Sequence, residues 1–184
     1  MARRDRAALQ AAQWAETQSV LGLVGTLTIT WAGVERMLDE LIAWYQHHGT
    51  ELQAEHPRSL SAKLKYLRVM QRDPRFSPET QEFLRQTRIE AKRLGDARHD
   101  LIHGLLHRRP WRGGAWHTQR VIYDGPFARV QDKAYSQEEL RSIIAQASDL
   151  GGYLSPKVWV IIGGDGRRFP ASDLENARRE LGIS

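Results

Sequence analysis

The sequence predicts a mainly α protein: an up-and-down antiparallel helical bundle with a small β-hairpin insert and a short strand-helix extension at the C-terminus. Two observations carry this prediction. Apolar residues recur at helical spacing over residues 19–47 and again over 78–107. Between these helices and the last part of the chain, strand-forming residues flank an Asp-Gly turn at 124–125.

The length of 184 residues suits a single domain that can bury a substantial core. The pattern divides this domain into three parts. They are a helical core over about 19–107 and 136–154, the hairpin insert over about 115–133, and the C-terminal extension over about 157–184.

The first long helix has the clearest pattern in the chain. Its apolar residues are spaced 4-3-4-3-4-3-4 and therefore line one continuous buried stripe. They are Val20, Val24, Leu27, Trp31, Val34, Leu38, Leu41 and Tyr45. Residues 1–18 are charged and alanine-rich, and they extend this helix or form a frayed arm. Gly49 is the expected stop.

The elements after the first helix are predicted from helix-breaking residues and N-terminal caps. Ser59 indicates the start of a short helix over 59–71, and Pro74 breaks the chain before a long helix over 78–107. After the hairpin, Ser136 and Glu139 form a capping box for a helix that buries apolar residues as far as Leu154.

The C-terminal extension is predicted as one strand and one helix. Residues 158–162 are all apolar and lie between Pro156 and Gly163, which is typical of a buried strand. Ser172 and Glu175 predict the cap of a last short helix.

One residue of the second long helix interrupts its apolar stripe. Each helical residue advances about 100°, which places Arg98 on the face of Leu94 and Leu101. A guanidinium on an apolar face must be paired, or its desolvation is costly. His103 projects roughly 140° away from Arg98 on a straight helix. Either the helix breaks near Gly95, or a second copy of the chain supplies one of the two residues.

Arg98, His99 and His103, with Gly104 directly after them, resemble the signature of the HEPN superfamily (higher eukaryotes and prokaryotes nucleotide-binding domains). That motif is an arginine, four to six residues and a histidine, and Asn, Asp or His usually follows the arginine. The resemblance covers residues 19–107 well and 136–154 more loosely. It implies four or five antiparallel helices, usually dimerised. In the ribonuclease members two motifs meet across the dimer interface.

The resemblance implies a metal-independent endoribonuclease that needs no cofactor. The RNA 2′-hydroxyl would attack the adjacent phosphate and leave a cyclic phosphate and a free 5′-hydroxyl. His103 would be the general base, since the pKa of histidine lies near working pH. Arg98 would stabilise charge on the phosphate oxygens. His99 would position RNA or orient a catalytic group. A role as a toxin or defence effector would follow.

The same resemblance leaves a non-catalytic module open, because HEPN-like domains also act as antitoxin partners, nucleotide-binding modules or assembly pieces. Such a module would bind nucleic acid, nucleotide or a protein. In either case we expect a homodimer about residues 98–103, with a cognate antitoxin or regulatory protein as a candidate partner. Some HEPN antitoxins carry a tyrosine two residues after the motif histidine; here that residue is Leu105, so nucleotidyl transfer onto the motif is not expected.

Two acidic residues are candidates for supporting roles. Glu35 lies beside the apolar stripe of the first helix, where it is either a solvated helix charge or the partner that holds Arg98. Asp100 could fix a histidine tautomer, although a helix charge directed to solvent is the favoured interpretation.

The balance of charge is basic, with a formal net charge of +5 from 22 arginines and 5 lysines against 22 acidic residues. Arginine binds phosphate in a bidentate way, so this balance fits an RNA partner. An arginine-rich composition of the whole proteome explains it equally well. Lys65, Arg68 and Arg72 share one face of the short helix, which either follows a phosphate backbone or is an ordinary solvated face.

Three histidines have a spacing that could bind a metal ion. His99, His103 and His107 have the spacing i, i+4 and i+8, and successive pairs could bind zinc on a helix. The glutamate of the His-Glu-x-x-His pattern is missing, and a further ligand such as His117 would have to come from elsewhere. We expect no metal site.

The lack of cysteine excludes disulfides, thiolate metal sites and thiol catalysis. No apolar run approaches the roughly 20 residues of a membrane span, and the N-terminus lacks an apolar signal core. We therefore expect a cytoplasmic protein that does not associate with membranes.

Overall fold

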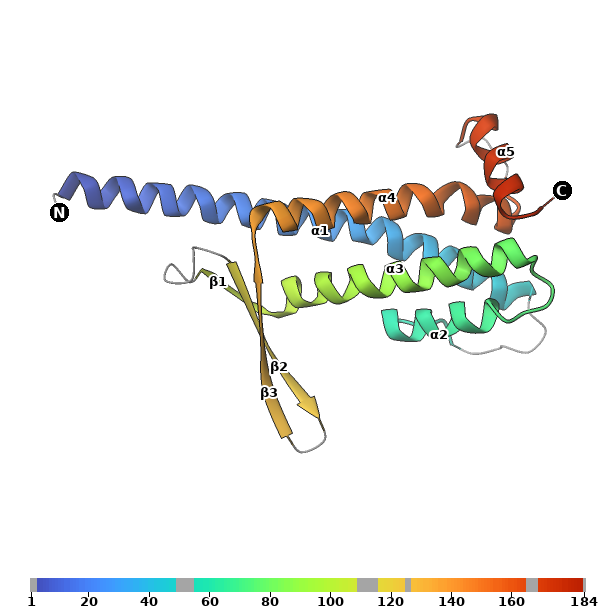
Figure 1. The fold of residues 1–184 in the computed structure, drawn as a ribbon, viewed down its shortest axis with the longest axis horizontal. Helices are drawn as coiled ribbons and strands as arrows, with labels where there is room; N and C mark the ends of the chain where they lie inside the picture. The colour runs from blue at the N-terminus through green and yellow to red at the C-terminus, as the bar shows by residue number, and fades with distance from the viewer. Residues whose placement is uncertain (1–2, 49–54, 109–115, 125–126, 165–168, 184) are drawn as a thin grey trace. The chain divides into compact units, whose positions relative to one another are not determined.

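The computed structural model describes residues 3–48, 55–108, 116–124, 127–164 and 169–183. It is mainly helical, with a small antiparallel sheet (Figure 1). The chain divides into two compact units. Unit 1 comprises residues 1–29 and 97–145, and unit 2 comprises residues 30–96 and 146–184.

Three of the helices, α1, α3 and α4, contribute residues to both units. The helices are α1 (Arg3–His48), α2 (Leu60–Met70), α3 (Pro78–His103), α4 (Gln137–Ile162) and α5 (Ala171–Glu180). The strands are β1 (Leu105–Arg108), β2 (Trp116–Asp124) and β3 (Phe127–Tyr135). None of the described helices has a stretch long and apolar enough to cross a bilayer.

The stripe of α1 forms the centre of the unit 2 core, as predicted. Trp31, Val34, Leu38 and Leu41 are at most 1% exposed. In unit 1 the same stripe buries Val20 and Leu27, while Val24 is half-buried. The alanine-rich residues from Arg3 onward belong to the helix as well. The 3.6-residue period thus outweighs the weak helix propensity of the glycines and threonines over 22–33.

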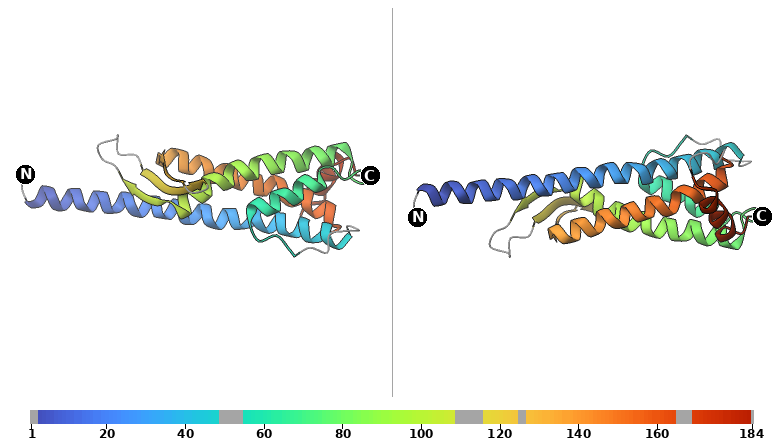
Figure 2. Two further views of the ribbon diagram at one scale, coloured as in Figure 1. Left: turned by 90° about the horizontal axis from the view of Figure 1, so that it is seen from below. Right: turned by 90° about the horizontal axis from the view of Figure 1, so that it is seen from above.

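The helices of unit 2 lie side by side, but they do not alternate in direction (Figure 2). Lys63 of α2 pairs with Asp39 of α1, and Tyr66 bonds to Gln46, so α1 and α2 run the same way. The simple up-and-down order predicted from the sequence therefore does not hold for these two helices. The segment over residues 49–59 is longer than the few residues that usually join adjacent antiparallel helices.

The direction of α3 and a contact of α4 follow from side-chain packing within unit 2. A Cβ built on Gly95 of α3 would lie 3.2 Å from Trp31, near the start of the unit 2 part of α1. The opposite end of α3 begins just after Phe76, whose ring packs on Tyr45. Helix α3 is therefore antiparallel to α1. Met37, six residues after Trp31, accepts a hydrogen bond from Ser155 in α4.

The sheet of unit 1 confirms the predicted hairpin and extends it. Strands β2 and β3 pair from Asp124↔Phe127 to Trp116↔Tyr135. A third strand, β1, was not predicted and pairs with the first part of β2, from Leu105↔Gln119 to Arg108↔Trp116. The sequence pattern wrongly placed these residues in the helix that was expected to reach 107.

A glycine explains why α3 ends at His103. A Cβ on Gly104 would lie only 2.4 Å from the carbonyl oxygen of Asp100 and 3.0 Å from Thr118. The amide of Gly104 donates to that same carbonyl, at 2.9 Å. Only glycine allows the last turn of α3 to close this tightly against β2 while the chain leaves as a strand.

The predicted strand at 158–162 is wrong, because α4 continues through it to Ile162. Its buried residues keep a helical spacing past Pro156. They are Ala147, Leu150, Leu154, Val158 and Ile161. A short apolar run alone does not distinguish a strand from a buried helix. The helical spacing of the buried residues from Ala147 to Ile161 shows that this run belongs to a helix. Pro156 removes one backbone donor from the helix without ending it.

The capping predictions were partly right. Ser59 accepts a hydrogen bond from the amide of Ala62 at the start of α2. Ser136 and Glu139 form the reciprocal box before α4. The last helix exists, but it begins after Pro170 and has no side-chain cap, so the predicted cap by Ser172 and Glu175 is wrong.

Two glycines of unit 2 provide a matched test of this packing. We expect Gly95→Leu to lower the free energy of unfolding by about 1–3 kcal/mol, because a Cβ there would meet Leu60 and Trp31. Gly33→Leu should raise it by up to about 0.8 kcal/mol, because that Cβ meets open space and glycine is a poor helix former. Urea unfolding of both variants measures the difference. Equal midpoints would contradict the packing described for α3.

Candidate active site

Two motif histidines lie together at the end of α3. The rings of His99 and His103 have centroids 4.6 Å apart and are tilted by 48°. Both residues are exposed. Helix α3 is continuous from Pro78 to His103, so the break considered near Gly95 does not occur. One chain thus presents two imidazoles to solvent on the same helical face.

Arg98 lies on a different face from this pair. On the continuous helix it projects roughly 140° away from His103. The residue is half-buried, and its Nε is buried without a hydrogen-bond partner among the described residues. Within one chain the structure therefore does not bring Arg98 and His103 to a common point. Glu35 belongs to unit 2 and Arg98 to unit 1, so their pairing stays a prediction.

Asp100 is not the solvent-directed helix charge that was favoured from the sequence. It is 4% exposed and holds two cations from the sheet. One carboxylate oxygen lies 3.2 Å from Nη1 of Arg120 on β2, and the other accepts a hydrogen bond from Nζ of Lys133 on β3. A carboxylate this deeply buried requires such partners. Asp100 therefore connects the last turn of α3 to the hairpin.

One face of the hairpin is basic and carries an exposed aromatic ring. In the observed register, Arg120 and Lys133 share this face with Arg129, since alternate residues of a strand point the same way. Arg129 is exposed, and Phe127 on the same face of β3 is 76% exposed. Cations next to an exposed aromatic ring are the features with which proteins bind single-stranded nucleic acid.

The surroundings shift the protonation of two groups at this site. Partial burial lowers the pKa of His99, and the charges of Arg120 and His103 lower it further, against an opposing effect of Asp100. His99 is therefore neutral at neutral pH and able to accept a proton. Burial, with the charge of Asp100, raises the pKa of Tyr135 to about 12, so its phenol stays protonated.

The end of α3 separates His107 and His117 from the histidine pair on that helix. His107 lies on β1 rather than on α3, so the i, i+4, i+8 arrangement on one helix is wrong. Its ring instead lies 5.9 Å from His117 on β2. His117 is buried and bonds through Nδ1 to Asp132 at 2.9 Å. Within the described part of the chain, no three ligand-type side chains converge on a point.

The predicted RNA-binding residues lie elsewhere in the chain. Lys65 and Arg68 are exposed on α2, and Arg72 is exposed just after it, all in unit 2. Their exposure suits both a phosphate-binding face and an ordinary solvated face, so their role stays a prediction.

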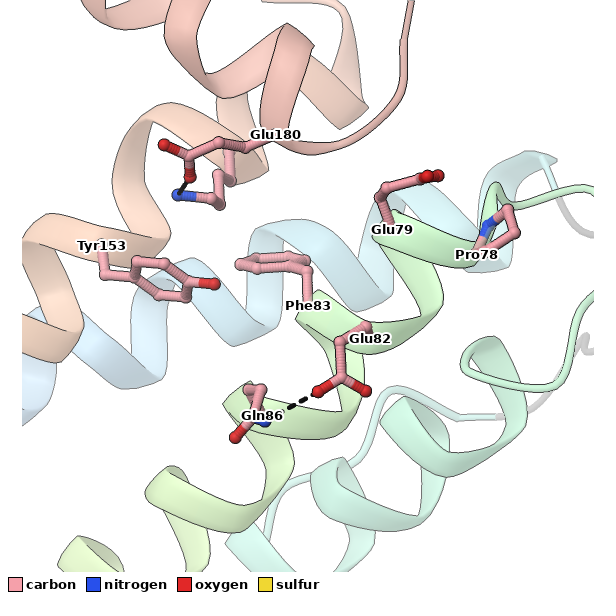
Figure 3. A pocket seen from close by; sticks show the side chains of 8 residues that line it. Pro78, Glu79, Glu82, Phe83, Gln86, Tyr153 and Glu180 are labelled. Carbon is pink, nitrogen blue, oxygen red and sulfur yellow. Dashed lines mark hydrogen bonds and ion pairs between the residues drawn. The ribbon is translucent and has the colours of Figure 1, made fainter.

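Unit 2 contains a pocket of about 450 Å³ with a different chemistry (Figure 3). Phe83 and Tyr153 form its aromatic part, with ring centroids 5.7 Å apart. The buried Lys157 stacks on Tyr153 and pairs with Glu180 at 2.7 Å. Glu79 and Glu82 also line the pocket. Three carboxylates against one ammonium repel phosphate, so this pocket does not suit RNA.

Sequence reasoning missed Arg120, Arg129 and Lys133 as site residues. They carry no local motif, because single cations on a strand are ordinary surface residues. Only the pairing of β2 with β3 and the burial of Asp100 select them. The sequence does not specify which helix the hairpin meets.

Comparison with protein-family models, with curated proteins and with solved structures gives no match to this chain.

Replacement of Asp100 by asparagine tests the electrostatics of the site. The charge of Asp100 raises the pKa of His99, so its removal should move the titration of His99 to lower pH. NMR titration of the ring protons measures this shift. Asp96→Asn is the control, because Asp96 pairs with Lys92 on an exposed surface. An unchanged or higher pKa of His99 in Asp100→Asn would refute the assigned contacts.

Proposed function

We propose that this chain is a metal-independent endoribonuclease that cuts RNA by attack of a 2′-hydroxyl on the adjacent phosphate. The observation that carries the proposal is the pair of exposed histidines on α3 in the same unit as a hairpin face with three cations and an exposed phenylalanine. This transphosphorylation needs a base for the 2′-hydroxyl, an acid for the leaving 5′ oxygen, and positive charge near the phosphate. The residues of unit 1 supply all three.

The two histidines divide the proton transfers between them. His99 takes the proton from the 2′-hydroxyl, because its lowered pKa leaves it neutral. The new bond from the 2′ oxygen to phosphorus forms as the bond to the 5′ oxygen breaks. His103 is the general acid and gives a proton to the leaving 5′ oxygen. The roles differ from the sequence-based expectation, in which His103 was the base, because the surroundings act on His99.

The cations bind and orient the RNA backbone. Asp100 fixes Arg120 and Lys133 against the end of α3, so that their positions do not depend on the substrate. Arg129 has no such anchor among the described residues of the hairpin and extends the charge along it. Phe127 offers a stacking surface for an unpaired base. This arrangement favours single-stranded RNA as the substrate class.

The HEPN resemblance adds further parts to the proposal. A second copy would bring its own motif to the site, which gives Arg98 a role as phosphate stabiliser that it lacks within one chain. A role as toxin or defence effector and a cognate antitoxin or regulatory partner rest on the same resemblance. The proposed cytoplasmic location rests on the sequence expectations instead.

Cleavage of a labelled, mixed-sequence RNA in excess EDTA tests the activity. Wild-type protein should leave cyclic phosphate and 5′-hydroxyl ends, and DNA of the same sequence should remain intact because it has no 2′-hydroxyl. His99→Ala and His103→Ala should each reduce the rate by about 10²–10⁴-fold.

The matched control for these variants is His48→Ala, another exposed helical histidine outside the site. Circular dichroism checks that each variant is folded. Cleavage that persists in both site variants, or that extends to DNA, would exclude this mechanism. Folded protein that binds RNA without cutting it would instead support the non-catalytic module.

Replacement of the exposed ring tests the substrate class. Phe127→Ala should raise the KM for single-stranded RNA by roughly 5–150-fold, since base stacking on an aromatic ring is worth about 1–3 kcal/mol. The value of kcat should change little, because Phe127 does not touch the reacting atoms. Val130→Ala, also exposed on β3 but on the opposite face, is the control. Equal KM values for the two variants would remove Phe127 from the binding surface.

A further inference from the structure

Two histidines of unit 1 lie opposite one another on neighbouring strands. His107 and His117 are partners in the register of β1 with β2, so their side chains point to the same face of the sheet. Their ring centroids are 5.9 Å apart, and the ring planes are inclined by 35°. A zinc–imidazole bond is about 2.0–2.1 Å long, so two rings at this separation can reach one ion placed between them.

A hydrogen bond fixes the orientation of the His117 ring. Nδ1 lies 2.9 Å from a carboxylate oxygen of Asp132 on β3. The carboxylate accepts the proton of Nδ1, so that in the neutral ring the lone pair is on Nε2. The two nitrogens lie on opposite sides of an imidazole, and β2 lies between β3 and β1 in the sheet. Nε2 is therefore on the side of the ring away from Asp132, where β1 carries His107.

The Nε2 atom of His117 is buried and has no hydrogen-bond partner among the described residues. The whole residue is only 5% exposed. Leaving a buried polar atom unsatisfied destabilises a fold, and native proteins keep few such atoms without a reason. A metal ion satisfies a nitrogen lone pair in this position, and a second imidazole next to it supplies another ligand.

We propose that His107 and His117 bind a divalent transition-metal ion of the zinc class. Imidazole nitrogens select such ions over Mg²⁺ and Ca²⁺, which prefer oxygen ligands. Asp132 is the carboxylate that commonly orients a metal-binding histidine through its other ring nitrogen. Among the described residues no group of three ligand-type side chains converges on a point, so water completes the coordination. Two protein ligands give an affinity in the micromolar range.

The ion would join the edge strand of the described sheet to its neighbour. Strand β1 has four residues and pairs with β2 alone, directly after the helix end that carries His103. Alternate residues of a strand point to opposite faces, so His117 lies on the face opposite to Arg120. The metal site is thus separate from the cations of the proposed RNA surface. It does not rest on ribonuclease activity, and its tests measure no cleavage.

Titration of the full chain, free of any purification tag, with Zn²⁺ tests the site. Calorimetry should give a one-to-one complex, and the NMR signals of the ring protons of His107 and His117 should shift together. Mg²⁺ should cause neither effect. His107→Ala should raise the Kd for Zn²⁺ at least about tenfold, because it removes one of two ligands. Asp132→Asn should raise the Kd by about 10–100-fold although both ligands remain.

The matched control is the double variant His99→Ala with His103→Ala. These exposed histidines have the i, i+4 spacing with which a helix surface can capture zinc, so their removal separates such capture from binding at the sheet. The double variant should keep the one-to-one complex and its Kd. Zinc binding that survives His107→Ala but is lost in the double variant would place the ion on α3 and overturn the proposal. Folded wild-type protein that binds no Zn²⁺ would overturn it as well.

Discussion

The arrangement of unit 1 depends on one buried carboxylate. Asp100 is 4% exposed on the last turn of α3, where an unpaired charge would be strongly destabilising. Arg120 and Lys133 neutralise it from two neighbouring strands. The pairing therefore requires that the helix end and the hairpin fold against each other. The same contact holds the basic face of the hairpin near His99, whose pKa responds to both Arg120 and Asp100.

Local chemistry determines the elements that could be predicted from the sequence. The 4-3 spacing of α1, the caps at Ser59 and Ser136, and the strand-forming residues of the hairpin are local signals, and each prediction was confirmed. The failures involve choices that local sequence leaves open. Residues 158–162 suit a strand or a buried helix, and only the stripe that includes Leu154 decides for the helix.

Local sequence likewise predicts the histidines of the candidate site but not its cations. The motif residues His99 and His103 stand out in the sequence because of their spacing, and the structure places their rings together. The cations that accompany them come from strands 20 to 33 residues after Asp100 in the chain, as the numbers of Arg120 and Lys133 show. No periodicity connects such distant residues. The net charge of +5 is equally uninformative about position, since the pocket of unit 2 is acidic.

The burial of Asp100 breaks a local rule, because charged residues of a helix are usually solvated. Sequences normally agree with their fold at every level, and departures concentrate where function imposes another demand. Here the compensating partners lie within the same unit, because Arg120 and Lys133 both pair with the carboxylate. The contact that makes this burial possible is therefore the same one that brings the cations of the hairpin to the end of α3, next to the two histidines.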